Sequence, residues 1–147
     1  MHHITTGFQM PKGSETILVA EGDEGLRTLL RIGLELCGYA VMAATSGHDA
    51  LRLADEHDRP IELLISDVAL PEMDGPELAR QLTARRAELK VLLLSSHLDE
   101  LAGVELDVAV LRKPVRPSAL VAKVREILDS APASLDSRPE AAMCPCC

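Results

Sequence analysis

The sequence predicts an α/β fold in which a parallel sheet of five strands is covered by helices on both faces. Short apolar runs with β-branched residues alternate along the chain with segments whose apolar residues recur at helical spacing. One run, residues 61–66, is apolar almost throughout and is followed by a loop rich in Pro, Asp and Gly, which is typical of a strand buried on both faces. This alternation indicates a doubly wound sheet.

The pattern places each element in order. The expected strands cover residues 16–20, 39–44, 61–66, 90–94 and 107–111. About five helices are expected, at residues 24–37, 47–57 and 76–86, as a short fourth helix within 97–103, and from 117 onward. Gly38 suits the end of the first helix, and Pro76 suits the start of the third. The expected strand order is the flavodoxin-like 2-1-3-4-5, which brings the ends of the first and third strands together.

Length and composition indicate one ordinary soluble domain. The chain has 147 residues, is 47% hydrophobic and 26% charged, and carries a net charge of -8, which disfavours nucleic acid or an anionic membrane as a direct partner. No apolar run is long enough to span a membrane, and the cysteines form no disulfide framework, so we expect a cytoplasmic protein. Residues 1–14 are predicted to be a disordered leader, 15–129 the domain, and 130–147 a disordered Ala/Pro/Ser-rich tail.

Polar residues follow four of the predicted strands, at Glu21, Asp67, Ser95 and Lys113. Because the carboxyl ends of parallel strands meet at one edge of the sheet, where ligands bind in such folds, we expect these side chains to converge. Three of them have an ordinary alternative when taken alone: a solvated strand end or helix cap for Asp67, a turn residue for Ser95, and a surface lysine for Lys113.

Residues 67–75, which read DVALPEMDG, resemble the phosphoacceptor segment of receiver domains from two-component response regulators. The family also has an acidic pair after the first strand, a Ser or Thr after the fourth, and Lys-Pro after the fifth. Glu21, Ser95 and Lys113-Pro114 stand at these places, so the resemblance covers about residues 15–128.

The resemblance implies a function and a partner. A phosphohistidine on a histidine kinase or a phosphotransfer protein would pass its phosphoryl group to Asp67. Such a domain catalyses at most its own phosphorylation and dephosphorylation. Lys113 and Ser95 would contact the phosphoryl oxygens, and Mg²⁺ would be held by Glu21, Asp67 and the carbonyl of Ala69. The Lys113–Pro114 peptide bond is expected to be cis.

Two departures from the family pattern bear on this function. Gly22 stands where the family has a direct Mg²⁺ ligand, so either Asp23 substitutes, or the ion binds weakly, or the domain is a degenerate receiver. The segment between Ser95 and Lys113 is about a helical turn shorter than usual. Val110 occupies the position of the family's switch aromatic, and a valine cannot swing as a tyrosine does.

Our leading hypothesis is a stand-alone response regulator that accepts a phosphoryl group on Asp67. Little chain follows residue 128, so we expect its output to be contact with a downstream protein or onward phosphotransfer, with no direct DNA binding and with homodimer formation left open. The first alternative is a phosphorylation-independent interaction module on the same fold. A haloacid dehalogenase-type phosphatase needs a second Asp where Ala69 stands, and a dinucleotide-binding domain or P-loop needs glycine motifs that the sequence lacks.

Two further features have both a chemical and an ordinary interpretation. His97 lies near the predicted site and could tune acyl phosphate hydrolysis, although a solvated loop position is the simpler reading. The thiols of the tail could bind a soft metal such as Cu(I) or Zn²⁺, although C-x-C-C is not an established zinc spacing and an incidental or reactive tail is favoured. These thiols belong to Cys144, Cys146 and Cys147. Cys37, by contrast, is expected in the core.

Overall fold

A computed structural model of the chain describes residues 13–97, 101 and 108–130. Its sheet has five parallel strands in the order β2-β1-β3-β4-β5, which confirms the predicted topology. The strands are β1 (Thr16–Ala20), β2 (Ala40–Ala44), β3 (Leu63–Asp67), β4 (Lys90–Ser95) and β5 (Ala109–Arg112).

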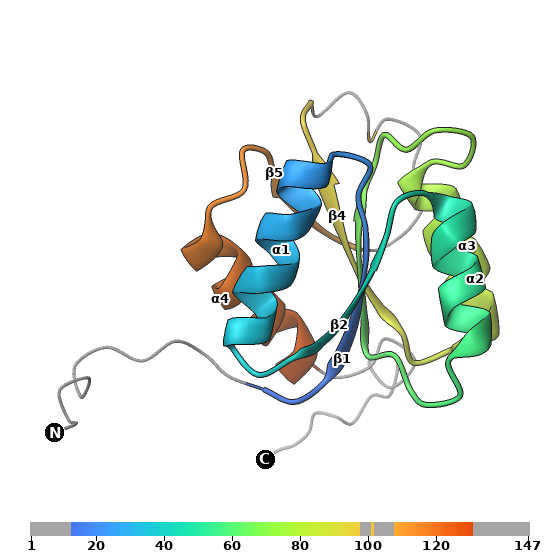
Figure 1. Cartoon of the computed structure of the whole chain (residues 1–147), viewed down its shortest axis with the longest axis horizontal. Helices are drawn as coiled ribbons and strands as arrows, with labels where there is room; N and C mark the ends of the chain where they lie inside the picture. The colour runs from blue at the N-terminus through green and yellow to red at the C-terminus, as the bar shows by residue number, and fades with distance from the viewer. Residues whose placement is uncertain (1–12, 98–100, 102–107, 131–147) are drawn as a thin grey trace, which may run out of the picture.

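The described residues contain four α-helices, which cover both faces of the sheet (Figure 1). They are α1 (Glu24–Leu36), α2 (Gly47–Glu56), α3 (Gly75–Arg85) and α4 (Pro117–Asp129). In Figure 1, α1 and α4 lie on one side of the sheet and α2 and α3 on the other. The short helix predicted within 97–103 falls largely outside the described residues, as do most of the predicted leader and tail.

Strand pairing shifts several predicted strand boundaries, most of all those of β3 and β5. β3 begins at Leu63 and includes Asp67, because the parallel register pairs Leu63 with Lys90 and Asp67 with Leu94. β5 runs from Ala109 to Arg112, because its ladder pairs Ser95 with Arg112, one residue beyond the predicted end. Hydrophobicity locates a strand, whereas the neighbouring strand decides where its hydrogen bonds start and stop.

Side-chain caps start three of the helices. An Asp or Ser side chain accepts a hydrogen bond from the backbone N–H three residues on, which satisfies one donor that the first helical turn leaves free. These caps are Asp23 on α1, Ser46 on α2 and Asp74 on α3. At the other end of α1, Gly38 has φ +99°, the left-handed conformation that the sequence predicts for a glycine there.

The hydrophobic core has two layers, one on each face of the sheet. Leu18, Leu64 and Leu93 point to the side of α2 and α3, whereas Ile17 and Ile65 point to the side of α1 and α4. All five residues of β3 are buried, as expected for a central strand. Cys37 is buried in the layer beneath α1, which confirms its predicted place. No helix among the described residues is long and apolar enough to cross a bilayer.

Candidate functional site

The four polar residues predicted to converge all lie at the carboxyl edge of the sheet. Glu21 follows β1, Asp67 and Ser95 are the last residues of β3 and β4, and Lys113 follows β5. Glu21, Asp67 and Ser95 are buried. The strand order places the ends of β1, β3, β4 and β5 side by side, so residues far apart in sequence share one pocket.

Lys113 joins the two carboxylates of this pocket. Its Nζ lies 2.8 Å from Oδ2 of Asp67, to which it donates a hydrogen bond, and 3.5 Å from Oε1 of Glu21. Burial alone would lower the pKa of Lys113. The hydrogen bond to Asp67 and the charge of Glu21 outweigh burial, and the pKa of Lys113 is raised. The ammonium therefore stays charged at neutral pH.

Glu21 is buried, but only one of its two carboxylate oxygens accepts a hydrogen bond among the described residues. Its Oε2 accepts a hydrogen bond of 3.0 Å from the backbone N–H of Asp23, whereas its buried Oε1 has no hydrogen-bond partner among the described residues. Burial is the main cause that raises the pKa of Glu21, and the nearby charge of Asp67 adds to it. Oε1 is thus an acceptor that faces the Asp67–Lys113 pair and still has bonding capacity.

Tight backbone packing fixes the position of Asp67. Its Oδ1 accepts a hydrogen bond of 3.2 Å from the N–H of Ala69, and the N–H of Gly75 donates to the Val68 carbonyl at 2.9 Å. A side chain on Gly75 would collide with the carbonyl of Asp67, so only glycine allows the loop to close this tightly. Glu72 in the same loop has φ +68°. The loop therefore holds the carboxylate of Asp67 in a fixed place.

Gly22, which follows Glu21, has open space around it. A β-carbon built on Gly22 would meet no atom closer than the Thr45 carbonyl, at 3.8 Å. The carboxylate of Asp23 does not fill this space, because it is exposed and its Oδ2 caps α1 by accepting from the Leu26 N–H at 2.8 Å. Among the residues that the structure describes, no group of three or more His, Cys, Asp or Glu side chains gathers as a metal site.

Ser95 is tied to its own loop. Its hydroxyl donates to the backbone carbonyl of His97 at 2.6 Å, and its carbonyl accepts from the N–H of Lys113 at 2.9 Å. His97 is exposed. The Lys113–Pro114 peptide bond is cis, as expected from the family resemblance. Ser95 and Lys113 are thus linked through the backbone at the edge of the sheet.

Most of the chain matches one known protein family. The family model of the response regulator receiver domain matches residues 17–125 of this chain. This chain belongs to the response regulator receiver family. The receiver is 34% identical over 119 residues to the response regulator receiver protein CpdR of Brucella abortus, a match that covers 78% of this chain and 98% of CpdR.

Other relatives are longer proteins. The receiver is 35% identical to the alkaline phosphatase synthesis transcriptional regulatory protein PhoP of Bacillus subtilis, over 78% of this chain. It spans only 49% of PhoP, and only 13% of the Brucella abortus sensor kinase CckA, to which it is 31% identical.

Solved structures confirm the fold. The receiver domain of the hybrid histidine kinase CckA matches with a TM-score of 0.68 and 32% identity, covering 78% of this chain and 99% of that one. A response regulator receiver protein from Sinorhizobium medicae gives a TM-score of 0.72 at 24% identity, and the match covers 80% of this chain and 96% of that one. At that identity the second likeness supports the fold alone.

The donors of this receiver's pocket suit Mg²⁺ in kind but are few. Mg²⁺ prefers oxygen ligands and is commonly held by one or two carboxylates together with water. Asp67 and Glu21 supply two carboxylates at the sheet edge, and Oε1 of Glu21 lacks a hydrogen-bond partner among the described residues. The carbonyl of Ala69 lies in the loop that follows Asp67. The residues therefore fit the ion, with one carboxylate fewer than the family pattern because of Gly22.

Sequence reasoning missed two residues that support the site. The buried hydroxyl of Ser66 donates to the Asp67 carbonyl at 2.9 Å, beside Gly75. Its signal was present, since Ser66 is a polar residue inside an otherwise apolar strand. Arg27 donates to the Glu21 carbonyl at 2.9 Å, a contact that helical periodicity does not reveal. Val110, at the expected switch position, is half-buried in β5 opposite Leu93.

Proposed function

We propose that this receiver accepts a phosphoryl group from a phosphohistidine onto Asp67 and signals through contact with another protein. The observation that carries the proposal is the pairing of a buried carboxylate with a lysine, Asp67 with Lys113, at 2.8 Å on the carboxyl edge of the sheet. Family membership supports the same reaction. The donor would be a histidine kinase or a histidine phosphotransfer protein.

The transfer replaces one phosphorus bond by another. A carboxylate oxygen of Asp67 forms a bond to phosphorus while the bond from phosphorus to the donor imidazole nitrogen breaks. The electron pair of the broken bond stays on the imidazole, and the released histidine takes up a proton. Lys113, already paired with Asp67, neutralises charge on the phosphoryl oxygens as a flexible point charge. The chain's main contributions are position and charge.

Mg²⁺ is the cofactor that this donor set implies. Asp67, Glu21 and the carbonyl of Ala69 would hold it, and when bound it would neutralise charge on the phosphoryl oxygens. Glu21 suits the task because its Oε1 is buried and lacks a hydrogen-bond partner among the described residues. The carboxylate of Asp23 contributes less, because it caps α1.

Ser95 offers a route from phosphorylation to a change of shape. Its hydroxyl donates to the His97 carbonyl at 2.6 Å. A phosphoryl group on Asp67 presents anionic oxygens, which are stronger acceptors than a carbonyl. Transfer of the Ser95 hydrogen bond to the phosphoryl group would free the loop at His97 and alter the surface that a downstream protein contacts. The net charge of -8 argues against DNA as that partner.

Phosphoramidate tests the proposal directly, because its P–N bond is of the same type as that of phosphohistidine. The intact mass of the wild-type chain should rise by one phosphoryl group, and hydroxylamine should remove the added mass, as expected of an acyl phosphate. Asp67→Asn should gain nothing, whereas Asp23→Asn, next to the pocket, should still be modified. Equal modification of Asp67→Asn and the wild type would refute Asp67 as the acceptor.

Gly22 favours a second candidate, a receiver that acts as an interaction module without phosphorylation. The pocket lacks one carboxylate, and Lys113 already compensates Asp67. Titration with Mg²⁺, followed by NMR, separates the two candidates. Saturable shifts that disappear in Asp67→Asn support the phosphorylated switch. A lack of saturable, Asp67-dependent binding up to several millimolar Mg²⁺ supports the module.

A further inference from the structure

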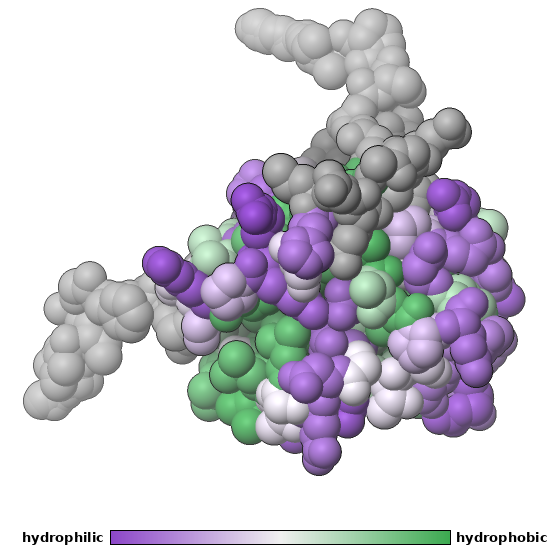
Figure 2. Space-filling model, turned by 90° about the horizontal axis from the view of Figure 1, so that it is seen from above, coloured by the Kyte–Doolittle hydropathy of each residue, from purple (hydrophilic) through white to green (hydrophobic). Residues whose placement is uncertain are grey.

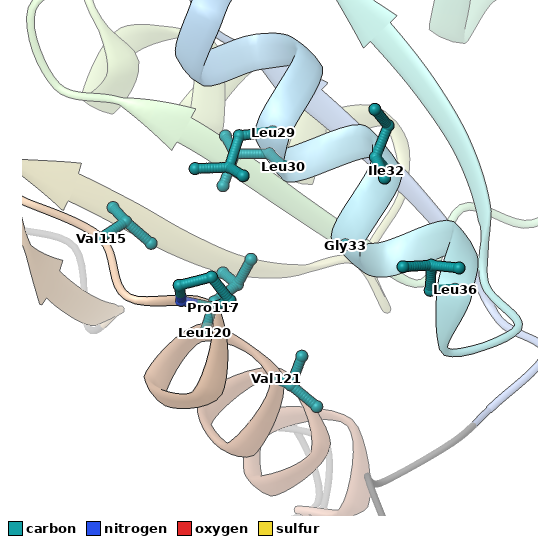
Figure 3. A pocket seen from close by; sticks show the side chains of 9 residues that line it. All are labelled: Leu29, Leu30, Ile32, Gly33, Leu36, Val115, Pro117, Leu120 and Val121. Atoms are coloured by element: carbon teal, nitrogen blue, oxygen red, sulfur yellow. The ribbon is translucent and has the colours of Figure 1, made fainter.

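An apolar groove lies between α1 and α4, on the face of the sheet opposite α2 and α3. Its cavity volume is about 320 Å³, and it is lined by apolar side chains and glycine. Figure 3 shows that α1 supplies Leu29, Ile32 and Leu36 while Val115, Pro117 and Val121 come from the start of α4 and the loop before it. The groove thus begins two residues after Lys113 and runs away from the acceptor edge.

The α1 side of this groove is exposed to an unusual degree. Leu36 is 78% exposed, Leu29 47% and Ile32 46%, and these are the exposed large hydrophobic residues of the described chain. Figure 2 shows a hydrophobic cluster on the side of the molecule where α1 lies, whereas the side that carries α2 and α3 is mostly hydrophilic. A contiguous apolar patch with a hydrophilic surrounding marks a surface that something covers.

The chain enters the described domain at one end of this groove. The N–H of Gly13 donates to the Cys37 carbonyl at 3.1 Å, just beyond Leu36 at the end of α1. A side chain on Gly13 would collide with Tyr39 and with Arg125 of α4, so Gly13 lies between the ends of both helices. Residues 1–12 are therefore attached beside the most exposed leucine of the patch.

The attached segment has the reach and the composition to cover the groove. Five extended residues between Gly13 and Phe8 span up to about 17 Å, and the stripe from Leu29 to Leu36 is about 10 Å long. The segment contains Ile4 and Phe8, the one Phe of the chain, together with Lys12 and no acidic residue, while the whole chain carries -8. Tethering gives it a millimolar effective concentration at the groove, so a weak contact suffices.

We propose that residues 4–10 bind in the α1–α4 groove of their own chain, with Phe8 packed on Ile32 and Leu36. This contact would cover the apolar face next to the loop that carries Lys113, so that a partner protein would have to displace the segment. The inference is independent of phosphoryl transfer, and it holds or fails whether or not Asp67 is modified.

The scarcity of aromatic residues allows the contact of Phe8 to be tested by NMR. The chain has one Phe, one Tyr and no Trp, so a ring placed on Ile32 by residues 4–10 must be that of Phe8. In a methyl-labelled sample, the δ1 methyl resonance of Ile32 should lie upfield in the wild type and move downfield in Phe8→Leu. That variant keeps an apolar side chain and removes only the ring. Ile61, buried on the other face, is the internal control and should not shift.

Two outcomes would overturn the proposal. Identical Ile32 resonances in the wild type and in Phe8→Leu would show that Phe8 does not contact the groove. A difference that grows with protein concentration would show that a second copy covers the groove. The proposal requires that the Ile32 methyl resonance differ between the wild type and Phe8→Leu by the same amount at 20 μM and at 1 mM.

Discussion

Gly22 limits the negative charge around Asp67 and Lys113. The two carboxylates of Glu21 and Asp67 face the single ammonium of Lys113, so one negative charge remains. A third carboxylate at position 22 would have room, because a β-carbon there meets no atom closer than 3.8 Å. The pocket therefore attracts a divalent cation less strongly than it would with an acidic pair.

Gly22→Asp should raise the affinity for Mg²⁺ on the order of tenfold, within the range by which changes around a metal's ligands alter its binding. Isothermal titration calorimetry on the purified chain measures it. The same substitution combined with Asp67→Asn is the control and should lose most of the gain. Unchanged affinity in Gly22→Asp would mean that the missing carboxylate does not limit metal binding.

Glu21 destabilises the fold in its charged form, because burial raises its pKa above the ordinary value of 4.5. Folding is favoured by this residue below that value, and the benefit is lost as the pH rises through the raised pKa. Glu21→Gln should therefore increase the free energy of unfolding at pH 7, with the gain shrinking towards pH 4. Urea unfolding at both pH values measures the difference.

Glu77→Gln is the control for this prediction. The pKa of the exposed Glu77 is lowered, chiefly by its hydrogen bond with Gln81 and also by Arg80, so its charged form is favoured in the fold. Neutralising Glu77 should bring no gain at pH 7. A stability gain of equal size in both variants would show that general charge reduction, and not the burial of Glu21, is responsible.

Glu72 holds a left-handed conformation, φ +68°, in the loop that follows Asp67. Such a conformation costs a residue with a side chain about 1 kcal/mol or more, and a glycine much less. Part of that gain is offset by the greater freedom of glycine in the unfolded chain. Glu72→Gly should therefore stabilise the chain by about 0.5 kcal/mol in chemical denaturation. Glu72→Ala should not, since alanine retains the strain, and a gain from alanine would contradict this explanation.

At the scale of elements, Arg86 connects α3 to the end of α2. Its guanidinium donates to the carbonyl of Ala54, in the last turn of α2, and to the carbonyls of His57 and Arg59, which follow the helix. Arg86→Met should cost about 2 kcal/mol, because these acceptors lose a charged donor. Thermal unfolding at constant pH measures the loss.

Arg85 provides a matched comparison one residue away. Its contact with Asp55, at 2.9 Å, is an exposed ion pair, which contributes little to stability in water. Arg85→Met should change the free energy of unfolding by less than about 0.5 kcal/mol. If both variants lost stability equally, capping of α2 would not explain the role of Arg86.

Local signals predicted where the elements lie. Gly38 after α1 and Pro76 at the start of α3 act within a few residues, so the sequence predicts them. Strand ends depend on a neighbour that is distant in sequence, which is why β3 starts at Leu63 and not at residue 61. Asp23 could cap α1 or replace the missing Mg²⁺ ligand, and the sequence does not show that it caps the helix.

For the whole molecule, the topology creates the site. Residues from four strand ends were predicted to converge, and the order β2-β1-β3-β4-β5 places them at one edge. The sequence also predicted the family, the cis Lys113–Pro114 bond and the gap at Gly22. It did not predict that Ser95 donates to its own loop, or that α1 and α4 leave an apolar groove, because both depend on packing in three dimensions.

The central claim is that Asp67 is a working phosphoryl acceptor despite Gly22. Intact mass after incubation with acetyl phosphate, with and without Mg²⁺ and beside Asp67→Asn, tests it most directly. We predict a gain of one phosphoryl group that requires Mg²⁺ and is absent from Asp67→Asn. No gain in the wild type, under conditions where Gly22→Asp is modified, would contradict the claim and identify the chain as a degenerate receiver.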